Sequence, residues 1–312
     1  MYHPYARGKQ NELLALRESA NILADASFVP IIEPVRSLLT GLERALKEIT
    51  DAGGRAIVIV NPRHGELQAD GSAIGDLLDQ HYQSNDAISA GILLHSNLST
   101  TAAVALIDAH ADHYPVVIHA GFTEARALAE ALGDRAQSFT HVFVEDQAST
   151  LYRRHFDGAT RILLHDGFEA LNNADYGSVD PFSDLHVTFP EFGVQGYGDF
   201  LTVGDRYREG GGPAYAVAIH LTYIDPDNDD EMLVQHFVSD TNGTPSDTAG
   251  KFREALDKLI AEVDSGHSKI LGTSGVDEFR RLHASGHYPG LGFVKKLSMR
   301  HHIETLANYH AP

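Results

Sequence analysis

The chain has 312 residues, of which 43% are hydrophobic, and its formal net charge is −19. This composition supplies a large apolar core, whereas the negative charge disfavours direct binding to the phosphate backbone of nucleic acids. The absence of cysteine excludes disulfides, thiolate metal sites and a cysteine nucleophile, and it favours a reducing, cytoplasmic compartment.

The first segment of the chain predicts a helix over residues 10–24. It contains no unbroken apolar stretch of the kind found in signal peptides. No apolar run further along reaches the ~18 residues of a membrane-spanning helix, so we expect no insertion into a membrane.

Eight short apolar runs rich in Val and Ile follow this helix, and each has Gly, Pro, Asn or Asp at its end or within two residues of it. Runs of this kind are typical of strands that are buried on both faces of a parallel sheet. They cover residues 28–35, 56–62, 89–97, 114–122, 141–146, 161–168, 184–190 and 214–223.

Segments with helical spacing separate many of these runs, at 38–49, 102–107, 123–132 and 146–155. An alternation of strands and helices at this period predicts an α/β fold, a (β/α)8 TIM-barrel-like domain in which the first and eighth runs are neighbours. The alternative is an open doubly wound sheet, but no G-x-G-x-x-G motif follows the first strand.

Beyond the eighth run, the sequence predicts a strand at 232–240 and helices near 247–263, 275–285 and 292–308. We therefore expect one domain over residues 1–312, with a barrel core at 28–264 and a helical extension at 265–312. Two stretches, 167–183 and 190–212, contain few helical signals, and long irregular loops of this kind are often functional.

Active sites of parallel barrels lie at the carboxyl ends of the strands. Most of the predicted strands end in an ionisable or amide side chain, and a cluster of such groups suits acid–base chemistry. The predicted catalytic residues are Glu33, Asn61, His119, Glu145, Asp166 and His220.

Several roles remain open for these side chains. Glu33, Glu145 or Asp166 would act as general base or metal ligand, His119 or His220 as general acid, and Asn61 would orient the substrate. His and carboxylate ligands suit Zn, Mn or Fe, so a divalent metal is one hypothesis for the cofactor, although no H-E-x-x-H motif is present. Alternation along a strand also allows some of these side chains to face the helices.

Long stretches of the chain resemble an uncharacterised bacterial family that is named after a myxobacterial locus tag. The resemblance runs nearly end to end and is carried by YHPYARGKQNELLALRE, PIIEPV, DGFEALNNADY, FSDLH, GYGDFLTVGDRYREGGGPAYAVAIHLTY, HFVSD, AGKFREAL and GLGFVKKLSMRHHIE. The first ~35 residues also resemble, more distantly, the phage beta-protein family.

The resemblance implies a setting rather than a reaction. Genes of the bacterial family often neighbour a companion family that resembles PD-(D/E)XK nucleases, which implies a two-component anti-phage module. The family's motif stretches and the two basic segments near the termini indicate ligand-binding residues at Arg7, Lys9, Asn173, Asp175, Tyr176, Asp199, Lys295 and Lys296.

Two functional hypotheses follow. The first is a hydrolase or lyase that acts on a small polar or phosphorylated ligand at the carboxyl-terminal mouth of the barrel. The second is a non-catalytic partner or regulator of a nuclease-like protein. We further expect the basic segments around Arg7 and Lys295, both predicted to lie outside the eight strand–helix repeats, to meet and bind an anion or a partner.

Overall fold

The computed structural model describes residues 1–83 and 85–311. The chain forms two units, each compact in itself. Unit 1 comprises Met1–His165 and Leu185–Asp199, and unit 2 comprises Asp166–Asp184 and Phe200–Pro312. The expectation of a single domain stays a prediction.

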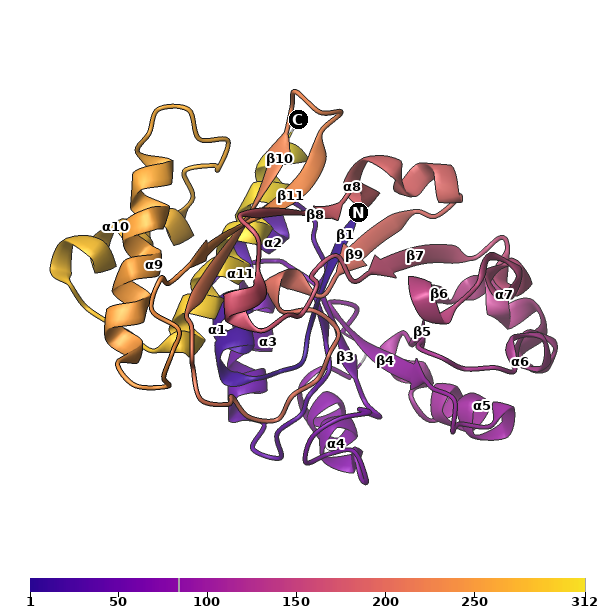
Figure 1. The fold of residues 1–312 in the computed structure, drawn as a ribbon. Helices are drawn as coiled ribbons and strands as arrows, with labels where there is room; N and C mark the ends of the chain where they lie inside the picture. The colour runs from indigo at the N-terminus through magenta and orange to yellow at the C-terminus, as the bar shows by residue number, and fades with distance from the viewer. Residues whose placement is uncertain (84, 312) are drawn as a thin grey trace. The chain divides into compact units, whose positions relative to one another are not determined.

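Unit 1 is a closed barrel of eight parallel strands, which confirms the predicted (β/α)8 TIM-barrel-like fold (Figure 1). In barrel order the strands are β1 (Tyr2–Ala6), β2 (Ile31–Ile32), β3 (Ala56–Ile59), β4 (Ile88–Leu94), β5 (Val116–His119), β6 (Thr140–Val144), β7 (Thr160–His165) and β9 (Gly196–Asp199).

Two of the predicted barrel strands are wrong. Residues 184–190 form the short helix α8 (Leu185–Thr188) and the start of the 3-10 turn η6 (Phe189–Phe192). The run at 214–223 contributes strand β10 (Ala218–Asp225), which belongs to a separate sheet in unit 2, so it does not pair with β2. The barrel nevertheless closes, because β1 pairs with β2 on one side and with β9 on the other.

The two strands that close the barrel lack the usual strand composition. β1 carries a central proline, and the sequence of β9 is GYGD. A Cβ atom on Gly198 would lie 2.1 Å from the carbonyl oxygen of His3, so the close approach of β9 to β1 requires glycine at this position.

The register of the strands separates an inner from an outer face. A Cβ on Gly91 of β4 would contact Ile59 of β3 and Ile118 of β5, so these three positions share one face. On the opposite face, His119 packs against Phe156 outside the strands. The first face therefore points into the barrel, and the second faces the helices.

The helical layer of unit 1 contains helices at each predicted segment, but 10–24 forms two helices, 146–155 forms a short α-helix flanked by 3-10 turns, and the helix at 72–81 was not predicted. Its α-helices are α1 (Gln10–Glu18), α2 (Ala20–Asp25), α3 (Thr40–Asp51), α4 (Ser72–His81), α5 (Thr100–Ala109), α6 (Ala125–Leu132) and α7 (Thr150–Arg153). Short 3-10 turns are η1 (Ala111–His113), η2 (Gly133–Ser138), η3 (Glu145–Gln147) and η4 (Arg154–Phe156). The predicted cap Ser99 begins α5 by accepting a hydrogen bond from the amide of Ala102.

Unit 2 contains an antiparallel sheet of three strands in the order β10-β11-β8, where β8 is Val179–Ser183 and β11 is Glu231–Val238. Its helices are α9 (Thr248–Val263), α10 (Ser274–Ser285) and α11 (Leu291–Tyr309), which confirms the predicted carboxyl-terminal elements. Two 3-10 turns, η5 (Asn173–Asp175) and η7 (Leu201–Val203), complete it.

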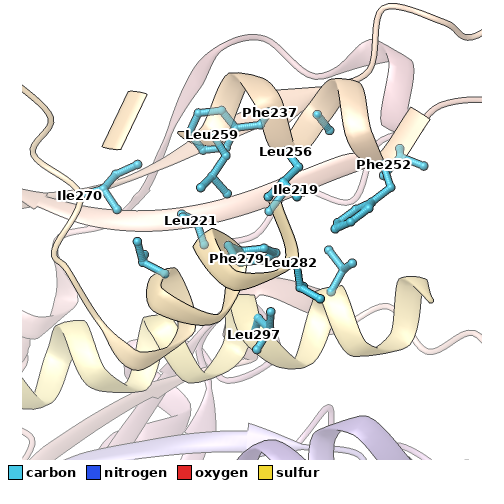
Figure 2. Packing of buried hydrophobic residues seen from close by; sticks show 14 residues of the cluster. Ile219, Leu221, Phe237, Phe252, Leu256, Leu259, Ile270, Phe279, Leu282 and Leu297 are labelled. Carbon is cyan, nitrogen blue, oxygen red and sulfur yellow. The ribbon is translucent and has the colours of Figure 1, made fainter. Parts of the chain in front are cut away.

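The core of unit 2 is formed by one face of β10 and the three helices. Figure 2 shows Ile219 and Leu221 of β10 together with Leu256 of α9, Phe279 of α10 and Leu297 of α11. Because side chains alternate along a strand, the residues between these apolar positions, His220 among them, lie on the other face of the sheet.

No helix in the described part of the chain is both long enough and apolar enough to span a membrane.

Candidate functional site

The predicted catalytic residue Glu33 lies directly after β2, on the inner face of the barrel at its carboxyl end. Its register follows from the pairing of Tyr5 with Ile31, two residues earlier. The carboxylate is 1% exposed and accepts hydrogen bonds from the Tyr5 hydroxyl at 2.9 Å and from the amides of Arg63 and His64 at 2.8 and 3.1 Å. With these three donors, Glu33 ties the end of β1 and the loop after β3 to the end of β2 at the mouth of the barrel.

Arg7 is buried beside this carboxylate, with 3.6 Å between its Nε and an oxygen of Glu33. Its backbone amide donates to the carboxylate of Glu12 in the first turn of α1. Arg7 immediately follows β1, a barrel strand, so the expectation that this basic segment lies outside the strand–helix repeats is wrong. The structure thus brings together two of the predicted site residues, Arg7 and Glu33.

Asn61 follows β3 and is engaged with the backbone of the neighbouring strand. Its Nδ2 donates to the carbonyl of Leu93 at 2.9 Å, and its Oδ1 accepts from the amide of Leu93 at 2.8 Å. Both ends of the amide are used in this way, which ties the end of β3 to β4. Orientation of a substrate by Asn61 stays a prediction.

Glu145 lies in η3, directly after β6, and contacts His165 at the end of β7. An oxygen of Glu145 lies 2.8 Å from Nδ1 of His165, and both side chains are about one third exposed. The hydrogen bond from His165 lowers the pKa of Glu145, so this carboxyl is ionised at neutral pH.

His119 ends β5, but its side chain faces the helices and not the barrel interior. Its Nδ1 lies 2.7 Å from the hydroxyl of Tyr152 in α7, and its Nε2 lies 2.9 Å from Nδ1 of His141 in β6. Nε2 of His141 in turn lies 2.8 Å from the carbonyl oxygen of Ala136. The ring is fully buried among aromatic side chains, as a structural group would be.

The remaining predicted residues of unit 1 have structural contacts. Lys9 is the N-cap residue of α1 and its carbonyl accepts from the amide of Leu13. Asp199 ends β9 and accepts a hydrogen bond from the hydroxyl of Tyr2 at 2.8 Å, and both side chains are buried.

Three predicted residues in unit 2 stabilise its irregular segments. Asp166 accepts from the amides of Phe168 and Asp205, Asn173 donates to the carbonyl of Ala216, and Asp175 accepts from Asn172. These bonds hold the loop that leads to β8 and position the side chains that follow it.

His220 lies in the middle of β10 and not at the end of a barrel strand, which corrects its predicted position. It sits directly opposite His236 of β11, and the two Nδ1 atoms are 2.7 Å apart. Nε2 of His236 lies 3.0 Å from a carboxylate oxygen of Asp180 in β8. The three strands of the sheet therefore each supply one member of a hydrogen-bonded series, Asp180–His236–His220, which we call the histidine relay.

The positions of the protons in this relay follow from the hydrogen-bond partners of the two rings. Burial lowers the pKa of His236 in spite of the nearby Asp180 carboxylate, so the ring is neutral at neutral pH. Since Asp180 can only accept, Nε2 of His236 carries the proton and its Nδ1 is an acceptor. His220 must then donate from Nδ1, which leaves a lone pair on its Nε2.

No residue that the structure describes forms a hydrogen bond with that nitrogen, and His220 is half-buried. Burial is the largest cause that lowers the pKa of His220 well below its usual value, and the neighbouring His236 and the positive charge of Lys295 lower it further. The relay thus ends in a nitrogen that is unprotonated at neutral pH.

Aromatic side chains surround the His220 ring. The ring centroids of Phe168 and Tyr176 lie 5.0 and 4.7 Å from its own, both in edge arrangements. The Tyr176 hydroxyl donates to the carbonyl of Glu169 and accepts from the amide of Leu171. This residue, predicted to bind a ligand, therefore packs against His220 while its hydroxyl proton is already used in a hydrogen bond.

The two predicted lysines of α11 differ in environment. Lys295 is exposed and lies within electrostatic range of His220. Lys296 is buried, with its Nζ 4.0 Å from the ring centroid of Phe293, an arrangement that stabilises an ammonium group.

Sequence reasoning missed Asp180, His236 and Phe168 as parts of a site. HFVSD, one of the stretches that carry the family resemblance, contains His236, and alternation with the buried Phe237 would have placed it on the same face as its cross-strand partner His220.

Within residues 1–83 and 85–311, no group of three or more His, Asp or Glu side chains is arranged to hold a metal ion. Comparisons with protein-family models, with curated proteins and with solved structures found no match for the chain.

Proposed function

We propose that the chain is an enzyme of the hydrolase or lyase class, and that His220 reacts with a small polar or anionic ligand. The barrel is consistent with an enzyme, but it is a fold that supports many chemistries and names none. The observation that carries the proposal is the histidine relay, which ends in an unprotonated nitrogen without a hydrogen-bond partner among the described residues.

The relay is suited to charge development on His220. When Nε2 takes up a proton or forms a bond, the proton on Nδ1 moves toward His236, and Asp180 stabilises the positive charge at the other end. A carboxylate that orients an imidazole in this way is a recurring arrangement in acid–base and nucleophilic catalysis.

A panel of chromogenic esters tests the proposal. We expect turnover of p-nitrophenyl phosphate, bis-p-nitrophenyl phosphate or p-nitrophenyl acetate, with kcat/KM lowered at least about 100-fold in His220→Gln. Asp180→Asn keeps His220 and should lose about 10-fold. His267→Gln, at an exposed position of unit 2, is the matched control and should retain full activity.

Equal activity in the wild type and in folded His220→Gln would contradict the proposal, as would a lack of turnover across the panel. The alternative, a non-catalytic partner of a nuclease-like protein in an anti-phage module, has the family resemblance as its support. A cytoplasmic location, likewise a proposal, rests on the cysteine-free composition.

A further inference from the structure

We infer that the loop after β3 and the end of β4 bind the carboxylate group of a small molecule, with Arg63 and His95 as the two donors. Both residues belong to unit 1 and follow strands of the barrel, at the end where parallel barrels bind their ligands. The inference goes beyond the proposed function, because it does not involve His220.

The pairing of β3 with β4 sets Arg63 and His95 beside each other. Beyond the last register pair of these two strands, the side-chain amide of Asn61 bonds both backbone groups of Leu93. Arg63 and His95 each follow this bridge by two residues. Burial lowers the pKa of His95, and the positive charge of Arg63 lowers it further, as it does for side chains that lie close together.

The guanidinium group of Arg63 is exposed, and no residue within 1–83 and 85–311 forms an ion pair or a hydrogen bond with it. The two carboxylates that hold this part of the chain have other cations as partners. Glu33 pairs with Arg7, and Glu66 pairs with Arg36. Because Arg63 is exposed, an anion can bind to its guanidinium group directly from solvent.

His95 contributes a donor whose position is fixed. Its Nδ1 accepts a hydrogen bond from the amide of Asn97 at 3.2 Å, so the proton of the neutral ring is on Nε2. No hydrogen bond joins this N–H group to a described residue, and the ring is half-buried. The lowered pKa keeps the ring neutral at neutral pH, so Nε2 offers a hydrogen bond without a charge.

The backbone that carries Arg63 is held in place by contacts within unit 1. Two amides of the loop donate to Glu33, and the amide of Glu66 donates to the carbonyl of Val35 at 3.0 Å. A Cβ on Gly65 would lie 2.2 Å from the same carbonyl oxygen, so the loop packs closely there. Binding then has to order only the Arg63 side chain, which lowers its entropic cost.

The charge of the two donors favours a carboxylate over a phosphate group. Arg63 supplies one positive charge and His95 supplies none. A carboxylate carries one negative charge, and its two oxygens match the parallel N–H groups of a guanidinium. A phosphate monoester carries about −1.5 to −2 at pH 7, so part of its charge would stay uncompensated on a chain whose net charge is −19.

NMR of the full, ¹⁵N-labelled chain at pH 7.5 tests the site. Sodium acetate is the probe and replaces sodium chloride at constant ionic strength, and the backbone amides of residues 63–66 and 95–98 are followed. We expect saturable shifts at these two segments with a Kd of about 1–10 mM, which is the range for a single small anionic group. Sodium phosphate in the same titration should bind more weakly.

Three variants assign the donors. Arg63→Gln should weaken acetate binding at least about 10-fold, because the charged hydrogen bonds are lost. His95→Asn keeps an acceptor for the amide of Asn97 and places no donor where Nε2 lies, so binding should weaken about 3-fold. Arg44→Gln removes another exposed arginine that has no partner among the described residues, and as the matched control it should keep the wild-type Kd.

Urea unfolding shows whether each variant is folded, and Arg63 and Arg44 have no side-chain bonds to lose. An unchanged Kd in folded Arg63→Gln would overturn the site, as would shifts that fail to saturate or an equal loss of binding in Arg44→Gln. Tighter binding of phosphate than of acetate would overturn the carboxylate. Because the readout is binding and not turnover, these outcomes are independent of the proposed function of His220.

Discussion

Nε2 of His119 lies 2.9 Å from Nδ1 of His141, and this contact settles the tautomers of both rings. Because the carbonyl of Ala136 can only accept, Nε2 of His141 is a donor, His119 donates to Nδ1 of His141, and Tyr152 donates to His119. Unit 2 repeats the histidine pair in His220 and His236. The difference lies in the last nitrogen, which accepts a hydrogen bond from Tyr152 in unit 1 and has no hydrogen-bond partner among the described residues in unit 2.

The hydroxyl of Tyr152 should therefore contribute to stability. Tyr152→Phe removes the donor to Nδ1 of His119 and leaves a buried acceptor without a partner, so we expect a loss of about 1–3 kcal/mol in the free energy of unfolding by urea. Tyr114→Phe removes a hydroxyl from a side chain that is 50% exposed and should change stability by less than about 0.5 kcal/mol. Equal losses in the free energy of unfolding for the two variants would show that the buried hydrogen bond between Tyr152 and His119 does not stabilise the fold.

Glu33 should be essential for the stability of the barrel mouth. In Glu33→Gln, one acceptor oxygen becomes a donor that faces the Tyr5 hydroxyl or the amides of residues 63 and 64, and Arg7 loses its counter-charge. We expect a loss of about 3 kcal/mol, measured by urea unfolding. Glu130→Gln breaks the exposed pair with Arg126 and should cost less than about 0.5 kcal/mol. A cost for Glu33→Gln as small as that of the control would show that the four contacts are weak.

The fold could be predicted from sequence wherever a strand is buried on both faces. Runs such as AIVIV and ILL appear as β3 and β4, because continuous Val, Ile and Leu is what a parallel barrel requires. β1 and β9 escaped prediction because their residues are selected by the closing contact, as at Gly198, and not by strand propensity. The run at 214–223 misled because β10, a strand of an antiparallel sheet, contains enough apolar residues to resemble a barrel strand.

The candidate site was predictable only in part, for the same reason. The rule that active sites lie at strand ends singled out Glu33, which follows β2. The register of β1 with β2 then brings its contacts Tyr5 and Arg7 to the same place. His220 was singled out as the end of a barrel strand that does not exist, and its partners His236 and Asp180 come from two other strands. The pairing of β11 with β8, which brings Asp180 to His236, joins residues 56 positions apart, and no local pattern in the sequence reports it.

Gly65 offers a test of the loop that delivers the amides of residues 63 and 64 to Glu33. Its φ is +77°, and a Cβ would lie 2.2 Å from the carbonyl oxygen of Val35. Gly53 has a φ of +78° and open space around the same position, so it is a matched control. We expect Gly53→Ala to cost about 1 kcal/mol and Gly65→Ala about 3 kcal/mol or more in urea unfolding. Similar costs would mean that the loop moves freely away from Val35.

The buried histidine pair of unit 1 should make stability fall in mild acid. Burial lowers the pKa of His141 from 6.5 to about 4 and lowers that of His119 in the same direction. Between these pH values the unfolded chain binds more protons than the folded one, so the free energy of unfolding is highest above pH 6.5 and decreases as pH falls toward 4, by about 3 kcal/mol for His141 alone. Urea unfolding between pH 8 and pH 5 measures this slope. His141→Gln keeps a donor for the carbonyl of Ala136 and should reduce the dependence of stability on pH. His267→Gln, the control at an exposed position, should leave that dependence unchanged. An unchanged dependence in His141→Gln would assign the acid sensitivity to other groups.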